Sequence, residues 1–165
     1  MPSRPTTAEE RLTTLGLLAE VWSALESRAA GTLACHGVSG VEFGVLLRLS
    51  RTPDHRLRMT DLTAQTALTT SGTTRVIDRL SAAGLVVRQA CPTDRRSIYA
   101  VLTPAGAEKV AAALPEHDAL IEQALVGPLG AAGFRDLAGH LRALRDALHP
   151  RATAGVESPQ TPVPA

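Results

Sequence analysis

Three residues at helical spacing, Gly72, Arg75 and Arg79, form the stretch best suited to contact with an anionic polymer. Steps of three and four residues place them on one face of a helix, so both guanidinium groups point the same way. Gly72 has no side chain, which would let backbone approach a phosphate or a base edge closely. Arginine donates in a fixed fork to phosphate oxygens and to guanine. This face therefore predicts a surface that reads nucleic acid.

Positive charge is concentrated around this face. Residues 48–99 contain nine arginines and four aspartates, a net charge of +5, whereas the remainder carries eight bases and twelve acids, a net charge of −4. The overall charge of +1 hides this difference. A basic third of the chain is typical of a patch that faces phosphates, while the acidic remainder faces solvent or a partner.

The pattern between Leu57 and Thr103 predicts a strand, helix, turn, helix, strand, wing and strand in that order. We expect the first helix over residues 61–67, with Thr60 as its N-cap, and the second from Thr70 or Ser71 to Ala83. The inner face of the second helix would hold Val76, Ile77 and Leu80, with Thr73 one turn earlier. Apolar runs at 85–87 and 98–102 flank a polar turn that contains Asp94, Arg95, Arg96 and, at its start, Cys91.

Amphipathic helices are expected on both sides of this unit. One spans about 8–33 and a second about 41–50. A third begins at Thr103-Pro104, bends at Pro115 and is separated by Gly127-Pro128 and residues 130–133 from a last helix that ends near 148. The fold class is therefore mainly α with a small antiparallel β wing, in one domain over 8–148, between a frayed end at 1–7 and a disordered tail rich in Pro, Ser and Thr at 150–165.

Other classes of protein find little support in the composition. No apolar run reaches the roughly eighteen residues that a membrane span needs, and the start does not resemble a signal peptide, so we expect a cytoplasmic protein with no membrane partner. The five histidines show no HxxxH or HExxH pair, which argues against a metal site. Without a glycine-rich phosphate loop or a GxSxG elbow, we expect neither an enzyme nor a cofactor.

Two sequence blocks resemble the MarR family of winged helix-turn-helix transcriptional regulators. One is TRVIDRLxxxGLV at Thr74–Val86, and the other is DRRSIYAVLTPAG at Asp94–Gly106. The resemblance covers about residues 10–148 and implies a homodimer, with dimerisation helices at 8–34 and 104–148 and a reading lobe at 57–103. The uncovered apolar stripes outside the lobe independently favour an interface. Two such lobes would straddle a pseudo-palindromic operator on double-stranded DNA.

The resemblance also implies roles for single residues. Ser71, Thr73, Thr74 and Arg75 would lie in or near the major groove, with Arg75 the best candidate for guanine. Arg79 would grip a phosphate, Arg96 would enter the minor groove, Asp94 would orient Arg96, and Arg95 is an additional cation. The chain departs from the family at Gly72, where a larger side chain is usual, and in the helix turn, where Thr66, Ala67 and Leu68 contain no glycine.

Regulation could follow two routes. MarR-like proteins often respond to phenolic or aromatic ligands, so we expect a repressor released by such a small-molecule effector, with Trp22, Phe43 and Arg48 as possible pocket residues. Trp22 alone would more commonly be a core or dimer-interface residue. The alternative is redox regulation through Cys35 or Cys91, the latter expected to be exposed at the wing. A further alternative is a winged-helix interaction or architectural module without a specific operator.

Overall fold

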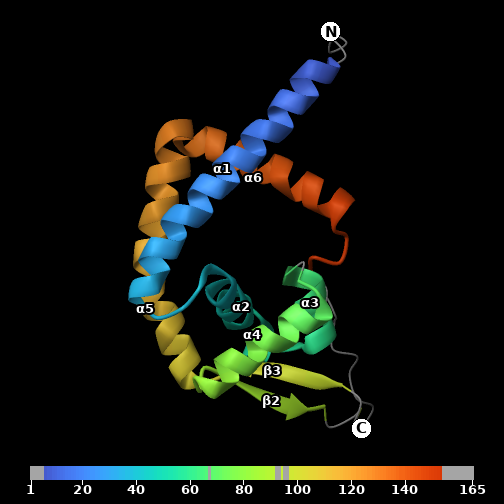
Figure 1. The fold of residues 1–165 in the computed structure, drawn as a ribbon, viewed down its shortest axis with the longest axis vertical. Coiled ribbons are helices and arrows are strands. Elements are labelled where there is room, and N and C mark those ends of the chain that lie inside the picture. The colour runs from blue at the N-terminus through green and yellow to red at the C-terminus, as the bar shows by residue number, and fades with distance from the viewer. Residues whose placement is uncertain (1–5, 67, 92–93, 95–96, 154–165) are drawn as a thin grey trace.

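The computed structural model describes residues 6–66, 68–91, 94 and 97–153. It confirms a mainly helical fold with a small three-stranded antiparallel sheet (Figure 1). The predicted disordered tail at 150–165 lies outside the described residues from 154 onward, as do residues 1–5 of the predicted frayed end. The elements are α1 (Ala8–Cys35), α2 (Gly40–Ser50), a 3-10 turn (Pro53–His55), β1 (Arg56–Arg58), α3 (Met59–Thr66), α4 (Thr70–Ala82), β2 (Val86–Ala90), β3 (Ile98–Leu102), α5 (Pro104–Ile121), a π-helical segment (Glu122–Val126) and α6 (Gly127–Leu148).

The first two helices each begin with a capping box. At α1, the Thr7 side chain accepts from the Glu10 amide while the Glu10 carboxylate accepts from the Thr7 amide. Ser39 and Glu42 form the same capping box at α2. Each box satisfies amide groups that a helix start would otherwise leave without partners. Between the two helices the chain turns through Gly37, whose φ of +69° suits glycine.

The reading unit follows its predicted order with small shifts at the boundaries. Thr69, one residue earlier than expected, caps α4 by accepting from the Gly72 amide at 3.0 Å. The predicted N-cap Thr60 is wrong, because α3 begins at Met59 directly after β1, which leaves Thr60 inside the helix. The predicted N-cap at Thr103 is confirmed, with Pro104 as the first residue of α5.

The sheet has the order β1-β3-β2, and both pairings are antiparallel. Val86 pairs with Leu102 and Leu57 pairs with Ala100, and all four side chains are buried. One face of the sheet therefore joins the core of the lobe. The strands β2 and β3 form the hairpin of the wing.

The buried core is confined to the reading lobe and the helices that touch it. Apart from Leu33 of α1, its largest fully buried side chains come from α2, α3, α4 and the sheet, and α5 adds Val110 and Ala113. α1 contributes only Leu33 near its end, and the described residues of α6 contribute no buried side chain. α1 and α5 run side by side away from this core (Figure 1). Most of α1 and all of α6 therefore lie outside the packed interior of a single chain.

The last helices differ from the sequence prediction at their junction. Helical backbone continues from α5 through the π-helical segment and through Gly127-Pro128, which was predicted to separate the helices. The break falls at Gly130, where φ is +67°, so the predicted separation at residues 130–133 is confirmed and the one at Gly127-Pro128 is wrong. Pro128 is tolerated because an amide at the start of a helix has no partner within the helix, so its absence costs little. Gly130 adopts the positive φ at which the chain leaves the helical path.

Within the described ranges, no single helix is both long and apolar enough to cross a membrane. Only α1 and α2 taken together are long and apolar enough for a span, and the two helices are bent by 78° at the break between them.

Candidate nucleic-acid interface

Helix α4 divides into an inner and an outer face, as its sequence predicts. Val76, Ile77 and Leu80 are buried against the core. On the opposite side Ser71, Arg75 and Arg79 are exposed, while Gly72 and Thr74 are half-buried. The residues with the strongest predicted DNA-contacting chemistry therefore share the open face of one helix.

Thr73 does not belong to this face. Its side chain is fully buried, its hydroxyl lies 3.0 Å from that of Thr63 on α3, and it donates to the Thr69 carbonyl oxygen at 3.2 Å. The expected place of Thr73 in the major groove is therefore wrong. The residue precedes Val76 and Ile77 by three and four positions, so the helix turns it inward. Thr73 packs α3 against α4 instead.

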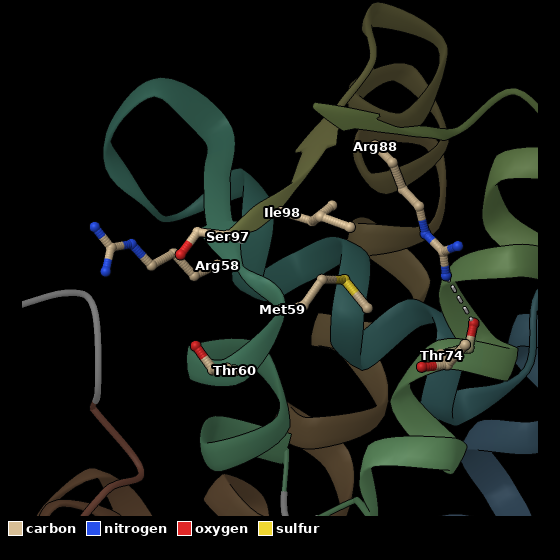
Figure 2. A pocket seen from close by; sticks show the side chains of 7 residues that line it. All are labelled: Arg58, Met59, Thr60, Thr74, Arg88, Ser97 and Ile98. Atoms are coloured by element: carbon tan, nitrogen blue, oxygen red, sulfur yellow. Dashed lines mark hydrogen bonds between the residues drawn. The ribbon is translucent and has the colours of Figure 1, made fainter. Parts of the chain in front are cut away.

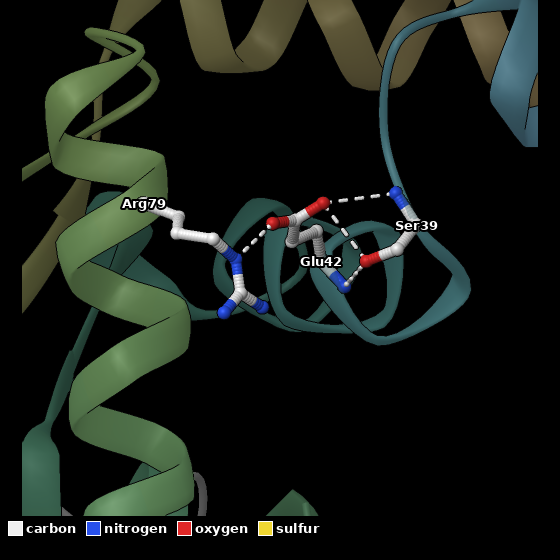
Figure 3. Close-up of polar contacts among 3 residues, drawn as sticks. All are labelled: Ser39, Glu42 and Arg79. Atoms are coloured by element: carbon white, nitrogen blue, oxygen red, sulfur yellow. Dashed lines mark hydrogen bonds and ion pairs between the residues drawn. The ribbon is translucent and has the colours of Figure 1, made fainter.

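Arg79 is exposed but is held from one side. Its Nε donates to Glu42 Oε1 at 2.8 Å, across from the start of α2 (Figure 3). The other carboxylate oxygen, Oε2, accepts from the Ser39 amide at 2.9 Å and the Ser39 hydroxyl at 2.8 Å. Burial alone would raise the pKa of Glu42, but the hydrogen bonds from Arg79 and Ser39 outweigh it and hold the pKa below 4.5. Glu42 is therefore an anion at neutral pH.

The wing is tied to α4 through Arg88. Arg88 Nη2 lies 2.9 Å from Asp78 Oδ1 and donates to the Thr74 carbonyl oxygen at 3.4 Å. At the tip, Asp94 Oδ2 accepts from the Ser97 hydroxyl at 2.6 Å, and the Asp94 carbonyl oxygen accepts from the Ser97 amide at 2.9 Å. Arg95 and Arg96 lie outside the described residues. The pairing of Asp94 with Arg96 therefore stays a prediction.

A hollow of about 260 Å³ opens between α4, the start of α3 and the sheet (Figure 2). Met59 and Ile98 supply apolar lining, Arg88 lies over Thr74, and the remaining residues around it are Arg58, Thr60 and Ser97. The sequence reasoning did not propose Arg58 or Arg88 as site residues. The available signal was the charge count, since both belong to the basic third of the chain.

Arginines 56 and 58 flank the ring of Tyr99. The guanidinium carbons of Arg56 and Arg58 lie 5.1 and 5.9 Å from the ring centre, and Arg58 Nε donates to Tyr99 Oη at 3.4 Å. That hydrogen bond, and then the charge of Tyr99, raise the pKa of Arg58. β1 thus adds ordered positive charge beside the wing, stacked in the manner of a cation over an aromatic face.

The residues predicted for an effector pocket separate in the structure. Trp22 is 61% exposed on α1, whereas Phe43 is 2% exposed and its ring lies 4.9 Å from the ring of His117. Phe43 is a core residue, because the inner side of α2 faces α5 and not solvent, so its expected role as a pocket wall is wrong. Arg48 is exposed, and partial desolvation followed by the like charge of Arg145 lowers its pKa. Arg48 and α6 are therefore close enough to interact electrostatically.

The two cysteines differ from expectation. Cys35 is exposed, but Cys91 is 4% exposed, so the predicted exposure of Cys91 at the wing is wrong. The Cys91 amide donates to the Ser97 carbonyl oxygen at 2.9 Å, which extends the hairpin, and Sγ lies 3.9 Å from Tyr99 Oη. In the part of the chain that the structure describes, no group of three or more His, Cys, Asp or Glu side chains is placed to hold a metal ion.

Comparison with known proteins gives the arrangement its context. The MarR family model matches residues 36–97. Sco3205 of Streptomyces coelicolor, a MarR family transcriptional regulator solved in complex with DNA, is 31% identical, and the alignment covers 93% of this chain and 96% of that one with a TM-score of 0.79. The chain belongs to the MarR family. It is therefore a DNA-binding transcriptional regulator with the winged helix-turn-helix that the two sequence blocks predicted.

Two further relatives agree with this assignment. AbsC, also a MarR family regulator from Streptomyces coelicolor, is 28% identical over 90% of this chain and 99% of its own, with a TM-score of 0.78. YkoM of Bacillus subtilis (strain 168), named as an uncharacterized HTH-type transcriptional regulator, is 36% identical over 93 residues. That alignment spans 56% of this chain and 58% of YkoM. Both relatives are named as transcriptional regulators.

Proposed function

We propose that the chain is a homodimeric, sequence-specific repressor that leaves a pseudo-palindromic operator when a small aromatic or phenolic ligand binds. The observation that carries the proposal is an uncovered apolar stripe on the helices outside the reading lobe. On α1 the stripe comprises Leu12, Leu15, Leu18 and Trp22, and on α6 it comprises Leu141, Leu144 and Leu148. Their exposed fractions run from 44% at Leu141 to 83% at Leu148.

A second copy of this chain is the occupant that fits the stripe. Both segments repeat at steps of three and four residues, which is the spacing of a helix face that packs against other helices. Large contiguous apolar patches are rare on monomers and mark interfaces. We therefore assign residues 8–34 and 104–148 to dimerisation and residues 57–103 to DNA reading. Trp22 then acts as an interface residue.

The exposed face of α4 supports the assignment of DNA contacts. We place Ser71, Thr74 and Arg75 at base edges in the major groove and Arg79 at a phosphate. Asp94, Arg95 and Arg96 form the proposed wing contact in the minor groove. Acting from two copies, these contacts would fix the spacing of the two halves of the operator.

Arg48 supports an anionic effector. It lies on α2 within electrostatic reach of Arg145 on α6, so a carboxylate or phenolate between the lobe and the dimerisation helices would relieve the repulsion between these cations. Such a ligand would favour one spacing of the two lobes over another, and operator release would follow as a shift in population. The setting we propose for this regulator is the cytoplasm, where it reaches chromosomal DNA.

Fluorescence anisotropy with a duplex selected from genomic fragments tests the reading face. Arg75→Ala should weaken binding by about 1–3 kcal/mol and relax discrimination at one base position on each half of the site. Arg142→Ala on α6 removes the same charge from an exposed site outside the lobe and serves as the matched control. Equal affinities for Arg75→Ala and Arg142→Ala would overturn the assignment. A small ratio of operator to competitor affinity would indicate an architectural module instead.

Sedimentation equilibrium tests the pairing. Leu15→Glu places a charge in the middle of the α1 stripe and should convert dimers to monomers at micromolar concentration, whereas Glu20→Gln on the same exposed helix should leave the mass unchanged. A monomeric wild-type protein would remove the basis for two-lobed operator recognition.

A further inference from the structure

The Glu42 side chain connects the start of α2 to α4, two helices that are far apart in the sequence. Oε2 belongs to the capping box of α2, whereas Oε1 accepts from Arg79 on α4. The side chain of Glu42 is only 15% exposed, whereas that of Arg79 is 57% exposed. The carboxylate is therefore fixed on one side and presents one oxygen to the reading helix.

The geometry at Arg79 leaves its DNA-facing atoms available. Only Nε is engaged by Glu42, and Figure 3 shows both terminal nitrogens turned away from the carboxylate. A carboxylate that sequestered an arginine would take two parallel hydrogen bonds from the guanidinium fork. Glu42 instead divides its two oxygens between α2 and α4. A phosphate could still bind both terminal nitrogens of Arg79 end-on.

We propose that Glu42 is a positioning residue for DNA binding, which orders the Arg79 guanidinium so that its terminal nitrogens face a phosphate. The inference rests on the proposed function, in which the α4 face contacts DNA. An arginine held through Nε loses less rotamer freedom when it binds a phosphate than one that must first be ordered. Glu42 thereby increases DNA affinity although its own charge repels DNA.

The same network continues toward the dimerisation helices. The turn between α1 and α2 carries Ser39, and it is held on the other side by Lys109 of α5, whose Nζ donates to the His36 carbonyl oxygen at 3.0 Å. His36 Nε2 also lies 3.3 Å from Glu116 Oε2 of α5. α5 therefore supports the turn that carries Ser39. Ser39 in turn bonds to Glu42, which is the hydrogen-bond partner of Arg79.

The direction in which Glu42→Gln changes DNA affinity shows whether Glu42 positions Arg79 for DNA or withholds it from DNA. Glu42→Gln keeps the capping box, because glutamine can replace glutamate at that position, but it removes the charge that holds Arg79. Loss of an acid near DNA ordinarily strengthens binding, since less charge opposes the phosphates. Positioning predicts the reverse, a loss of about two- to fivefold in affinity, which is the range that an exposed ion pair spans.

The matched control is Glu108→Gln, which changes the net charge equally at an exposed acid of α5 outside the contacts that hold the turn before α2. All proteins are full-length and are titrated against a fluorescein-labelled mixed-sequence duplex over a series of salt concentrations, because phosphate contacts do not need a particular sequence. Far-UV circular dichroism melts confirm that each variant is folded. Glu108→Gln should bind as tightly as wild type or more tightly.

A double-mutant cycle with Arg79→Gln completes the test. Arg79→Gln should weaken binding and reduce the slope of log affinity against log salt by about 0.9, the value for one lost phosphate contact. In that background Glu42→Gln should have no weakening effect, because there is no guanidinium left to position. Tighter binding by Glu42→Gln alone, or equal effects of Glu42→Gln in both backgrounds, would overturn the positioning role.

The outcomes distinguish this inference from the proposed function. If Arg79→Gln reduces the salt slope while Glu42→Gln leaves affinity unchanged, the DNA contact stands and positioning fails. If neither Arg79→Gln nor Arg75→Ala changes binding, the reading face itself is misassigned and the inference falls with it. Arg79→Lys provides a last check, because it keeps the charge but has no guanidinium fork to orient. In that background Glu42→Gln should not weaken binding further.

Discussion

The hydroxyl oxygens of Thr63 and Thr73 lie 3.0 Å apart between the two helices of the reading unit. Thr73 is fully buried, and it also donates to the Thr69 carbonyl oxygen at 3.2 Å. This contact joins α3 to α4 on the side away from the open face of α4. The packing of α4 on α3 therefore includes a polar pair that lies away from the proposed DNA-contacting face.

Thr73→Val should lower the free energy of unfolding by about 0.5–1.5 kcal/mol, because valine keeps the shape but loses the hydrogen bonds of the Thr73 hydroxyl. Thr63 still donates to the Met59 carbonyl oxygen. Urea denaturation measures the change, and anisotropy should show unaltered DNA affinity of the folded fraction. Ser71→Ala, on the exposed face, should do the opposite, with little change in stability and weaker DNA binding. A Thr73→Val protein of wild-type stability would contradict the packing role.

Gly106 in the first turn of α5 leaves no room for a side chain. A Cβ at this position would collide with the Leu85 carbonyl oxygen and come within 2.7 Å of a methyl carbon of Leu102. Gly106→Ala should therefore destabilise the fold by about 1–3 kcal/mol or more, since backbone must move. Gly139→Ala on α6, where nothing lies within 4 Å, should instead stabilise by up to about 1 kcal/mol. Thermal melts of both variants decide this, and equal melting temperatures would argue against the collision.

The lowered pKa of Glu42 makes part of the stability dependent on pH. A carboxyl group whose pKa is lower in the folded state stabilises it fully above the unfolded value and loses that contribution as pH falls through the folded value. Wild type should therefore exceed Glu42→Gln in stability by up to about 1 kcal/mol at neutral pH. The advantage should be lost as the pH falls through the lowered pKa of Glu42. Urea denaturation at several pH values measures it, and a constant difference would show that the charge does not matter.

The two thiols should react at different rates in the folded protein. Cys35 is exposed and Cys91 is buried, so one equivalent of a thiol-specific disulfide reagent should react quickly and the second only as the wing opens. Absorbance of the released thiolate follows both phases, and Cys35→Ala should remove the fast one. Fast reaction in Cys35→Ala would show that Cys91 is accessible and would restore the case for a redox response at the wing.

The elements were predictable from sequence because local signals agree there. Thr103-Pro104 predicts the start of α5, and the two apolar runs around the polar turn predict β2 and β3. Positions that depend on tertiary packing were not predictable in the same way. Phe43 occurs within an amphipathic pattern that does not reveal whether its ring faces a ligand cavity or His117. The bond between Glu42 and Arg79 joins residues 37 positions apart, so no local pattern could indicate it.

Gly127-Pro128 shows a limit in predicting helix ends from sequence. Glycine followed by proline usually ends a helix, yet the helical path continues to the reversal at Gly130. A π-helical segment at Glu122–Val126 precedes these residues, and the backbone leaves the helical path at Gly130, whose φ of +67° suits glycine. Residue type marked both Gly127-Pro128 and residues 130–133, and it could not decide which of the two stretches breaks the helix.

The leucines that α1 and α6 leave exposed also have a consequence for the amount of protein. On the pairing proposed above, these helices complete their packing only when two chains meet, so mass action links folding to abundance. Dilution would then remove structure as well as partners. The number of copies in a cell would set how much binding-competent regulator exists, which makes the rate of its own synthesis a control on the promoter it occupies.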